Sequence, residues 1–411
     1  MRIRIIPFFS PLAQNELKIS IINQFSESNI QVITPDDFFN QAFKRNQTIL
    51  EQHNYIFVGT GGTEELIAQF LSKAKLRPPI ILLSYDKNNS LPAAMETRAY
   101  LHQNHITSRI IHAPLPQLTE RIQEWCEFAE IEKKIRNSRI GIIGKPSSWL
   151  IASNVNPFAV QQRWGLTIEE YPLTKIIDKL NDKLSEKYKL ALAQFIGRAA
   201  CSDIPEEEIR KAGVVTQALL EFVRNKNLDA VTLECFTLLE KTNITACYAL
   251  SHLNDLVGLT AGCEGDFPTT FTMMLAKRIS QQPVFMANIV DVDIDANSVV
   301  FAHCTVPTTI LEDYEITTHF ESSKSMAIRG KFKSQEITVL KVFGEDLSDF
   351  WISKGFITEN LVNEQGCRTQ IRVKLTESVK YFLEESFANH HVVILGDHLW
   401  KLQEFFSFIN R

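Results

Sequence analysis

Short apolar runs alternate with amphipathic segments in the first third of the chain. Three runs have the length and composition of buried strands: residues 30–34, 55–58 and 80–84. Two further segments, residues 64–73 and 118–134, repeat apolar positions at helical spacing. Strands that alternate with helices are typical of a parallel sheet covered by helices. The pattern predicts an N-terminal α/β domain over residues 1–137.

The middle of the chain repeats this alternation. Residues 140–143 form a predicted strand that ends at a Gly-Lys-Pro turn, and residues 230–233 form another. A predicted helix covers residues 243–256. A second helix follows Pro268, because proline suits the first helical turn. We therefore expect a second α/β domain over residues 138–282.

After Pro283 the periodicity changes from helical spacing to two-residue alternation. Five segments have strand character: residues 299–302, 314–318, 326–328, 337–343 and 370–374. Helical runs return at residues 379–387 and 399–409. This change predicts a β-rich C-terminal domain over residues 283–411. The expected fold class is α/β, with two Rossmann-like domains on parallel sheets followed by a β-rich, barrel-like domain.

Composition excludes several classes of partner. The chain has 411 residues, of which 45% are hydrophobic and 22% charged, as expected for a protein with an ordinary packed core. Its formal net charge is −5, without a block of like charges, which argues against nucleic-acid and membrane-surface binding. The N-terminal apolar run is too short for a signal peptide, and no apolar stretch is long enough to span a bilayer. These features favour a cytoplasmic protein.

The seven cysteines change this picture little. Their number is odd, and none is arranged as Cys-x-x-Cys. The spacings of Cys235, Cys247, Cys263 and Cys304 match no structural zinc pattern. We interpret the cysteines as reduced, mostly buried thiols.

Candidate chemistry gathers at three places in the second half of the chain. Glu264, His303 and His398 each lie at the edge of a predicted strand or helix. A carboxylate and two imidazoles are suitable ligands for a hard or borderline divalent ion if the fold brings them together. Taken singly, each has a simpler explanation. Glu264 precedes a helix start, where a carboxylate stabilises the helix dipole, and a lone histidine is more often structural than a ligand.

Two loops offer weaker signals. The Gly-rich segment 59–63 follows a strand and opens a helix, so its amides could hold an anion, but the glycine spacing is not the dinucleotide fingerprint. An ordinary strand–turn–helix junction is the preferred interpretation. Ser147, Ser148 and Trp149 follow another strand at a turn. Hydroxyls and an indole suit a polyol ligand, although serines also cap helices.

At these places the chain resembles the L-fucose/L-arabinose isomerase superfamily, in particular its shorter L-fucose isomerase-like branch. Each matching motif is short, but the set follows the family's order over nearly the whole chain. The matching segments are Thr60-Gly61-Gly62-Thr63-Glu64, Gly144-Lys145-Pro146-Ser147, Trp149-Leu150-Ile151-Ala152-Ser153, Cys263-Glu264-Gly265-Asp266, Phe285-Met286-Ala287-Asn288, Ala302-His303-Cys304-Thr305-Val306-Pro307, His319-Phe320-Glu321-Ser322 and Gly396-Asp397-His398.

The resemblance implies an activity and an assembly. It implies aldose–ketose isomerisation through an enediol, with a divalent metal, commonly Mn²⁺, bound between the second and third domains. It also implies a homo-trimer or homo-hexamer whose neighbouring subunits complete the site. The only other partner expected is a small-molecule sugar.

The resemblance also assigns roles to residues. Glu264 matches a metal ligand that also transfers the proton, and His303 and His398 match histidine ligands. Asn288 stands where the fucose isomerases place an aspartate ligand, and Asp291 is expected to supply the missing acid–base carboxylate, or Asp293 by a similar shift. The expected sugar-binding residues are Ser147, Trp149, His319 and Glu321.

Three functions follow from this reading. The leading hypothesis is a metal-dependent sugar isomerase. The second is a sugar-binding or regulatory protein that kept the fold after losing a ligand. The third, and the least favoured, is a nucleotide-dependent oxidoreductase that uses the loop 59–63.

Overall fold

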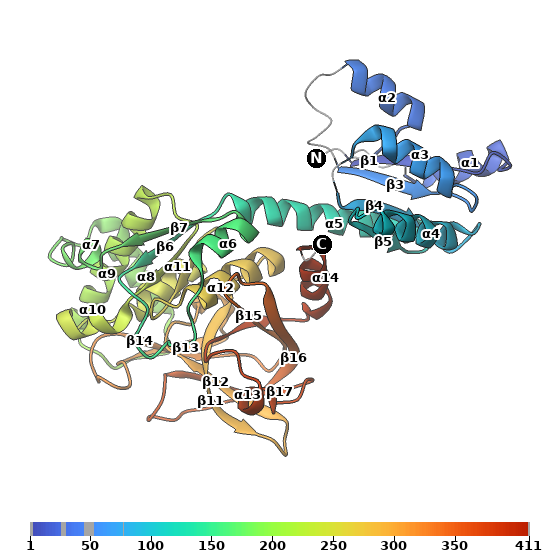
Figure 1. Ribbon diagram of the computed structural model, residues 1–411. Coiled ribbons are helices and arrows are strands. Elements are labelled where there is room, and N and C mark those ends of the chain that lie inside the picture. Colours follow the sequence, from blue (N-terminus) through green and yellow to red (C-terminus); the bar gives the residue numbers. More distant parts are fainter. Residues whose placement is uncertain (1–2, 26–29, 45–52, 77, 410–411) are drawn as a thin grey trace. The chain divides into compact units, whose positions relative to one another are not determined.

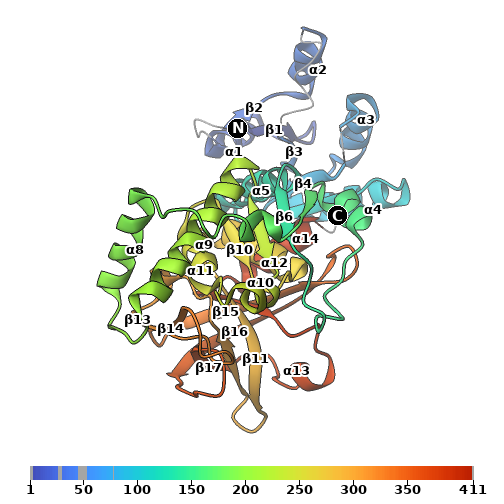
Figure 2. The same cartoon turned by 90° about the vertical axis from the view of Figure 1, so that its left-hand side faces the viewer.

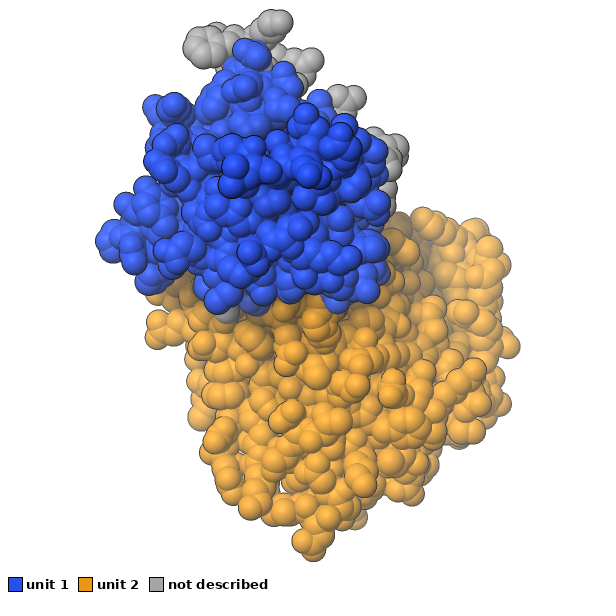
Figure 3. All heavy atoms as spheres, turned by 90° about the vertical axis from the view of Figure 1, so that its right-hand side faces the viewer, with its two compact units in different colours: residues 1–130, 407–411 blue, residues 131–406 orange. Residues whose placement is uncertain are grey.

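A computed structural model describes residues 3–25, 30–44, 53–76 and 78–409. The chain divides into two compact units, which Figure 3 distinguishes by colour. Unit 1 comprises residues 1–130 and 407–411, and unit 2 comprises residues 131–406.

Unit 1 is built on a five-stranded parallel sheet in the order β2-β1-β3-β4-β5 (Figure 1). Its strands are β1 (Ile3–Phe8), β2 (Ile30–Val32), β3 (His53–Val58), β4 (Ile80–Ser84) and β5 (Ser108–His112). The helical segments are α1 (Asn15–Ile22), η1 (Asn23–Phe25), α2 (Pro35–Lys44), α3 (Glu64–Ala74), α4 (Ser90–Gln103) and α5 (Leu115–Arg136). Helices cover the sheet, so β1 and β4 are buried along their whole length and their sequences do not alternate.

Unit 2 contains a second parallel sheet in the order β10-β9-β6-β7. Its strands are β6 (Arg139–Ile143), β7 (Thr167–Tyr171), β9 (Ala230–Leu233) and β10 (Thr260–Gly262). The helices of this part are α6 (Pro157–Trp164), α7 (Thr174–Ile177), α8 (Glu186–Arg198), α9 (Glu206–Asn225), α10 (Cys235–Thr242), α11 (Cys247–Asp255) and α12 (Phe267–Ser280). Because β9 and β10 are adjacent and parallel, the loops after them meet at one edge of the sheet.

The rest of unit 2 is a closed antiparallel barrel in the order β11-β12-β17-β16-β15-β18. Its strands are β11 (Phe285–Asp293), β12 (Ser298–His303), β15 (Glu336–Phe343), β16 (Asp349–Asn360), β17 (Thr369–Leu375) and β18 (His391–Leu395). β18 closes the barrel because it pairs with both β11 and β15. A small sheet joins β8 (Cys201–Ser202), β13 (Asp313–Thr317) and β14 (Ala327–Lys331). The remaining helical segments are η3 (Thr308–Ile310), α13 (Tyr381–Glu384) and α14 (Leu399–Ile409).

Helix α12 connects the second parallel sheet to the barrel (Figure 2). It packs against β9 and β10 on one side and against β15 and β18 on the other, and nearly all of its side chains are buried. The N-terminus of α12 therefore lies where the carboxyl end of β10 meets the barrel, which is where the candidate residues gather.

The expected fold class is confirmed: the protein is α/β, with two parallel sheets and a C-terminal antiparallel barrel. The three-domain boundaries at residues 137/138 and 282/283 stay predictions, although both fall between elements. The helix predicted over residues 243–256 is shorter, because Asn243 adopts a left-handed conformation that ends α10 and α11 begins at Cys247. Among the described helices, none has both the length and the apolar character needed to cross a membrane.

Candidate functional site

A cavity of about 430 Å³ in unit 2 collects most of the candidate residues. Its walls come from the carboxyl ends of β9 and β10, from β11 and β12 of the barrel, and from the segment before β18. The described residues that line it are Trp149, Cys235, Phe236, Leu239, Thr245, Ala246, Cys247, Cys263, Glu264, Asn288, His303, Cys304, His319, Phe320, Glu321, Cys367 and Asn389.

Glu264 occupies a strained turn between β10 and α12. Its φ is +62°, and Gly265 follows at +67°, so two consecutive residues are left-handed. A Cβ atom at Gly265 would lie 2.6 Å from the carbonyl oxygen of Lys145, so only glycine allows the Gly-Lys-Pro loop to pack this closely. The amide of Ser147 donates to the carbonyl oxygen of Glu264 at 2.9 Å. A positive φ is energetically unfavourable for a non-glycine residue, and such strained residues often occur at functional sites. The conformation of Glu264 is therefore consistent with a functional role for its side chain.

The carboxylate of Glu264 is buried and has two fixed neighbours. Nε1 of Trp149 donates to Oε2 at 2.8 Å, and Nε2 of His390 lies 3.5 Å from Oε1. Burial by itself raises the pKa of Glu264, but the adjacent, positively charged ring of His390 outweighs it and leaves the pKa below its usual value. Glu264 is therefore an anion in the folded protein at neutral pH.

His390 is held by Asp266, the N-cap of α12. Its Nδ1 lies 2.8 Å from Oδ2 of Asp266, while Oδ1 of Asp266 accepts the amide of Thr269 at 2.9 Å. Burial lowers the pKa of His390, but its hydrogen bond to Asp266 and the nearby carboxylates of Asp266 and Glu264 raise it to about 9. Burial likewise raises the pKa of Asp266, but His390 and Lys341 bring it down to about 2.

His303 supplies a second imidazole from the end of β12. Its Nδ1 lies 2.9 Å from Oγ1 of Thr305, and its ring centroid is 5.5 Å from that of His390. Burial, followed by the charge of His390, lowers the pKa of His303 to about 3, so this ring is neutral. A neutral imidazole is the form that binds a metal.

The donor groups fit a divalent cation. Ligand atoms of Cys263, Glu264 and His303 lie within 4.8 Å of one another. Nε2 of His390 is buried without a hydrogen-bond partner and points at Glu264, while a carboxylate holds its other ring nitrogen. Metal-binding histidines typically show this carboxylate–imidazole arrangement. Glu264 and His303 are therefore placed to hold a metal, and His390, which lies beside Glu264, can join them once its ring loses the proton that its raised pKa retains.

Several expected residues line the same cavity. Trp149 is 54% exposed, so one face of its indole is available to a ligand. Asn288 lies on β11, where its Oδ1 accepts a hydrogen bond from Asn389. His319 is buried beside Phe236, and burial lowers its pKa. Burial, followed by the charge of Glu264, raises the pKa of Glu321. The structure thus brings Asn288, Trp149, His319 and Glu321 together with Glu264, while their roles stay predictions.

Ser147 takes part in a different way from the one expected. Its backbone amide supports the turn at Glu264, and its side chain is not among the described groups that line the cavity. Its position fits a supporting contact for Glu264.

The structure does not bring His398 to the cavity. His398 follows the far end of β18, where its Nε2 lies 2.9 Å from the carbonyl oxygen of Leu395 and 3.1 Å from Nε2 of Gln282. His390 precedes the near end of the same strand and takes the place expected for His398. The expected position of His398 differs from the structure because a residue next to either end of a strand fits the same sequence pattern. The two ends of this five-residue strand are roughly 15 Å apart, so only one of them can reach the cavity. The missed signal was the pair of adjacent histidines, His390 and His391, at the start of the strand.

Asp291 and Asp293 also lie outside the described cavity lining. Oδ2 of the exposed Asp291 is 3.7 Å from Nη1 of Arg372, and Oδ1 of Asp293 accepts the amide of Ala296 in the turn after β11. A bulge between Ile289 and Asp291 shifts the register here. Neither aspartate is placed to supply the missing carboxylate.

Five of the seven cysteines line the cavity. Sγ of Cys263 lies 3.0 Å from Sγ of Cys235, while Cys247, Cys304 and Cys367 form a second group. Contact with Cys235 and burial raise the pKa of Cys263. None of the seven forms a disulfide in the structure, and their reduced state stays a prediction.

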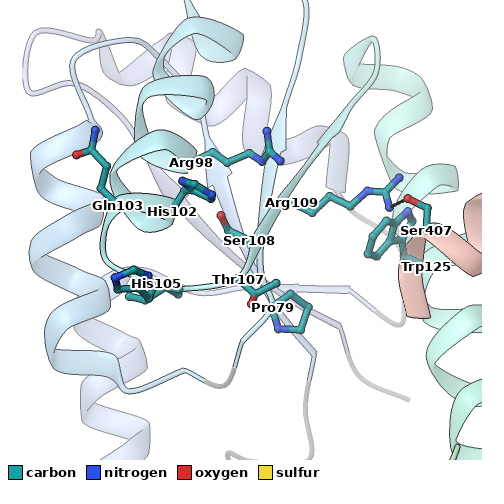
Figure 4. A pocket seen from close by; sticks show the side chains of 11 residues that line it. Pro79, Arg98, His102, Gln103, His105, Thr107, Ser108, Arg109, Trp125 and Ser407 are labelled. Carbon is teal, nitrogen blue, oxygen red and sulfur yellow. Dashed lines mark hydrogen bonds between the residues drawn. The ribbon is translucent and has the colours of Figure 1, made fainter. Parts of the chain in front are cut away.

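Unit 1 has a separate cavity of about 730 Å³ at the start of β4 and β5 (Figure 4). Arg98, His102, His105 and Arg109 line it, without a carboxylate among the described lining residues. The guanidinium of Arg109 lies 4.7 Å from the ring centroid of Trp125 and donates to Ser407. The cavity lacks the carboxylate that acid–base chemistry on a sugar would require.

The loop 59–63 lies in a shallow depression of unit 1. The amide of Gly61 donates to the carbonyl oxygen of Asn88 at 2.8 Å, and Oγ1 of Thr60 accepts the amide of Ser10 at 2.7 Å. These bonds tie the loop to its neighbours, as in the strand–turn–helix junction that the sequence favours.

Comparisons with known proteins point to sugar isomerases. No protein-family model matches the chain. A sulfoquinovose isomerase from Alkalicoccus urumqiensis is 21% identical over 220 residues, which are 53% of this chain and 49% of the relative. A protein of the same name from Priestia megaterium is 20% identical over 196 residues, 46% of this chain and 42% of the relative. The chain therefore matches about half the length of these curated relatives and is a distant homologue of proteins named as sugar isomerases.

Proposed function

We propose that the protein is a divalent-metal-dependent isomerase that interconverts an aldose and a ketose. The observation that carries the proposal is the position of Glu264 between two imidazoles. Each imidazole has one ring nitrogen engaged, His390 by Asp266 and His303 by Thr305, and the second nitrogen of His390 is buried without a partner. The similarity to sulfoquinovose isomerases supports the same class of reaction.

Glu264, His303 and His390 would hold the metal, with Mn²⁺ as the expected ion. One carboxylate and two imidazoles suit this ion and its first-row neighbours. When bound, the ion would lower the pKa of the hydroxyl groups that it contacts and of the C–H bond at C2 of the aldose.

The protein's own groups carry the proton. Glu264 is anionic, and its carboxylate takes the proton from C2 of the aldose and returns it to C1. Trp149 fixes one carboxylate oxygen, so the other faces the ligands and substrate. Glu321, whose pKa is raised by burial and by Glu264, is the second carboxyl group of the cavity and exchanges a proton with the sugar oxygens.

The cavity favours a neutral sugar. Its described lining holds two carboxylates, Glu264 and Glu321, and no lysine or arginine. Sulfoquinovose, named in the relatives, is a sulfonated sugar, and the described lining offers no lysine or arginine to pair with a sulfonate. The aromatic faces of Trp149, Phe236 and Phe320 suit the apolar face or methyl end of an uncharged sugar.

The decisive experiment combines metal analysis with solvent-deuterium incorporation. Purified protein is loaded with Mn²⁺ and incubated in deuterated buffer with neutral aldoses, neutral ketoses and sulfoquinovose in parallel. Label at C1 or C2 of a neutral sugar supports the proposal. Label in sulfoquinovose alone supports the isomerase and contradicts the neutral substrate. Metal-loaded protein that labels no sugar favours the alternative of a sugar-binding homologue. A trimer or hexamer stays a prediction, to be checked by light scattering.

A further inference from the structure

Two of the cavity's thiols come from neighbouring strands of one sheet. Cys235 follows β9 as the first residue of α10, and Cys263 follows β10 directly. Because β9 and β10 are parallel neighbours, their carboxyl ends place both sulfur atoms at one edge, 3.0 Å apart. Cys263 is also the residue before Glu264, so its sulfur and the Glu264 carboxylate share one turn.

The pair lies next to the ligands already described. The sulfur of Cys263, a carboxylate oxygen of Glu264 and a ring nitrogen of His303 are mutually within 4.8 Å. All three residues are buried, and Cys235 is partly exposed to the cavity. The sulfur of Cys235 adjoins that of Cys263 but lies outside this group, so the Cys235 side chain must rotate to complete a set of two sulfurs, one nitrogen and one oxygen. Thiophilic cations prefer such a set, and Mn²⁺ does not.

We propose that Cys235 and Cys263, together with Glu264 and His303, form a second coordination set that binds a thiophilic divalent cation of the Zn²⁺ or Cd²⁺ type. The inference rests on the proposed function in one respect: because both sets share Glu264 and His303, the thiophilic ion excludes the catalytic metal and blocks the carboxylate. The protein is an isomerase that this class of ion inhibits competitively with Mn²⁺.

Completing the set requires the Cys235 side chain to turn toward Glu264 and His303 and the two sulfurs to move apart. Metal–sulfur bonds of about 2.3 Å in a tetrahedral site place two thiolates ~3.8 Å apart. Cys235 and Cys263 are now 3.0 Å apart, so the sulfurs separate by less than about 1 Å. Each thiol releases one proton to solvent as its sulfur binds the cation, and no oxidant is needed.

The test uses Cd²⁺ on chelator-treated, fully reduced protein, because cadmium–thiolate bonds absorb in the ultraviolet. The wild-type protein is expected to bind one Cd²⁺ with the band of two thiolates. Cys235→Ser should halve the band and weaken binding at least about tenfold, since a thiolate ligand is lost. Cys263→Ser should do the same, with Cys263→Ala as a substitute if the serine variant fails to fold. The matched control is Cys367→Ser, because Cys367 lines the same cavity outside the proposed set. It should leave the band unchanged.

Opposite results overturn the inference. An unaltered band in both Cys235→Ser and Cys263→Ser, or an equal loss in Cys367→Ser, excludes this set. Excess Mn²⁺ should weaken the apparent Cd²⁺ affinity, and independence of the two ions would show that the sets are not shared. The readout does not need an enzymatic substrate. Two-thiolate Cd²⁺ binding without any isomerase activity would contradict only the proposed function, and Mn²⁺-dependent activity without the cadmium band would contradict only this inference.

Discussion

Nδ1 of His390 lies 2.8 Å from Oδ2 of Asp266, although Asp266 starts α12 and His390 immediately precedes β18. Asp266 therefore does two things at once: its Oδ1 caps the helix, and its Oδ2 fixes the orientation of an imidazole. The two tasks can be separated experimentally, because asparagine is as good an N-cap as aspartate but carries no charge.

Asp266→Asn should preserve α12 and weaken metal binding. Loss of a carboxylate behind a ligating histidine typically lowers metal affinity about 10–100-fold. Calorimetric Mn²⁺ titration measures this, and circular dichroism confirms the helix content. An affinity equal to that of the wild type would show that His390 is not a ligand.

His390→Ala and His398→Ala form a matched pair, because the two histidines flank opposite ends of β18. His390→Ala removes a ligand and should abolish stoichiometric Mn²⁺ binding at neutral pH, whereas His398→Ala should bind as the wild type does, because His398 contacts Leu395 and Gln282 instead. Metal analysis after dialysis checks both variants. The reverse order of effects would restore the role that the sequence predicted for His398.

Glu264→Gln should remove isomerase activity while leaving the protein folded. Glutamine can still accept from Trp149, but it cannot take a proton from carbon and is a weaker metal ligand. Loss of general acid–base help typically costs about 10²–10⁴-fold in rate. Saturating Mn²⁺ keeps the metal site filled, so the deuterium-exchange assay then measures the rate of the chemical step and not a loss of bound metal. A variant that retains wild-type exchange would place the proton transfer on another residue.

The metal-free protein should be most stable near pH 6.5. His303 and His391 have pKa values of about 3, lowered by burial from 6.5, so the unfolded chain binds more protons between these values and stability falls as the pH drops through this interval. Burial lowers the pKa of His390 too, but Asp266 and Glu264 raise it to about 9, so stability also falls as the pH rises from 6.5 to 9.

Urea unfolding in the presence of chelator measures this profile. Each pKa unit corresponds to about 1.4 kcal/mol, so the alkaline arm should amount to about 3 kcal/mol, and the acid arm, to which two histidines contribute, should be larger. His390→Gln should flatten the alkaline arm, and it should also reduce the acid arm in part, because the charge of His390 helps to lower the pKa of His303. Stability that rises between pH 6.5 and 9 in the wild-type protein would contradict the proton assignment of His390.

Elements whose pattern is local could be predicted from the sequence. Residues 80–84 and 230–233 are strands at the predicted positions, because an apolar run of strand length carries its own signal. The strand Asp349–Asn360 was not predicted. Exposed and buried residues alternate over only part of this strand, and its polar residues are of the types common in loops.

The site was harder to predict, because contacts between distant residues decide it. Glu264 and His303 could be chosen because each lies at the edge of one element. Choosing between His390 and His398 required knowing which end of β18 faces α12, and local sequence does not contain that information. The approach of Cys235 to Cys263 likewise depends on the neighbouring positions of β9 and β10 in the sheet.

The closure of the barrel by β18 has a consequence for how the protein is made. His390 reaches Glu264 only once β18 has inserted between β11 and β15, so a chain still lacking this strand has an incomplete ligand set. If the protein binds the proposed metal, binding and completion of the barrel are one thermodynamically linked event. At a free metal concentration of 100 times Kd, the linkage would add about 2.7 kcal/mol to the stability of the finished fold. The proposed ion would then stabilise the pairing of the last strand, and a chain that lacks this strand should bind the ion less tightly.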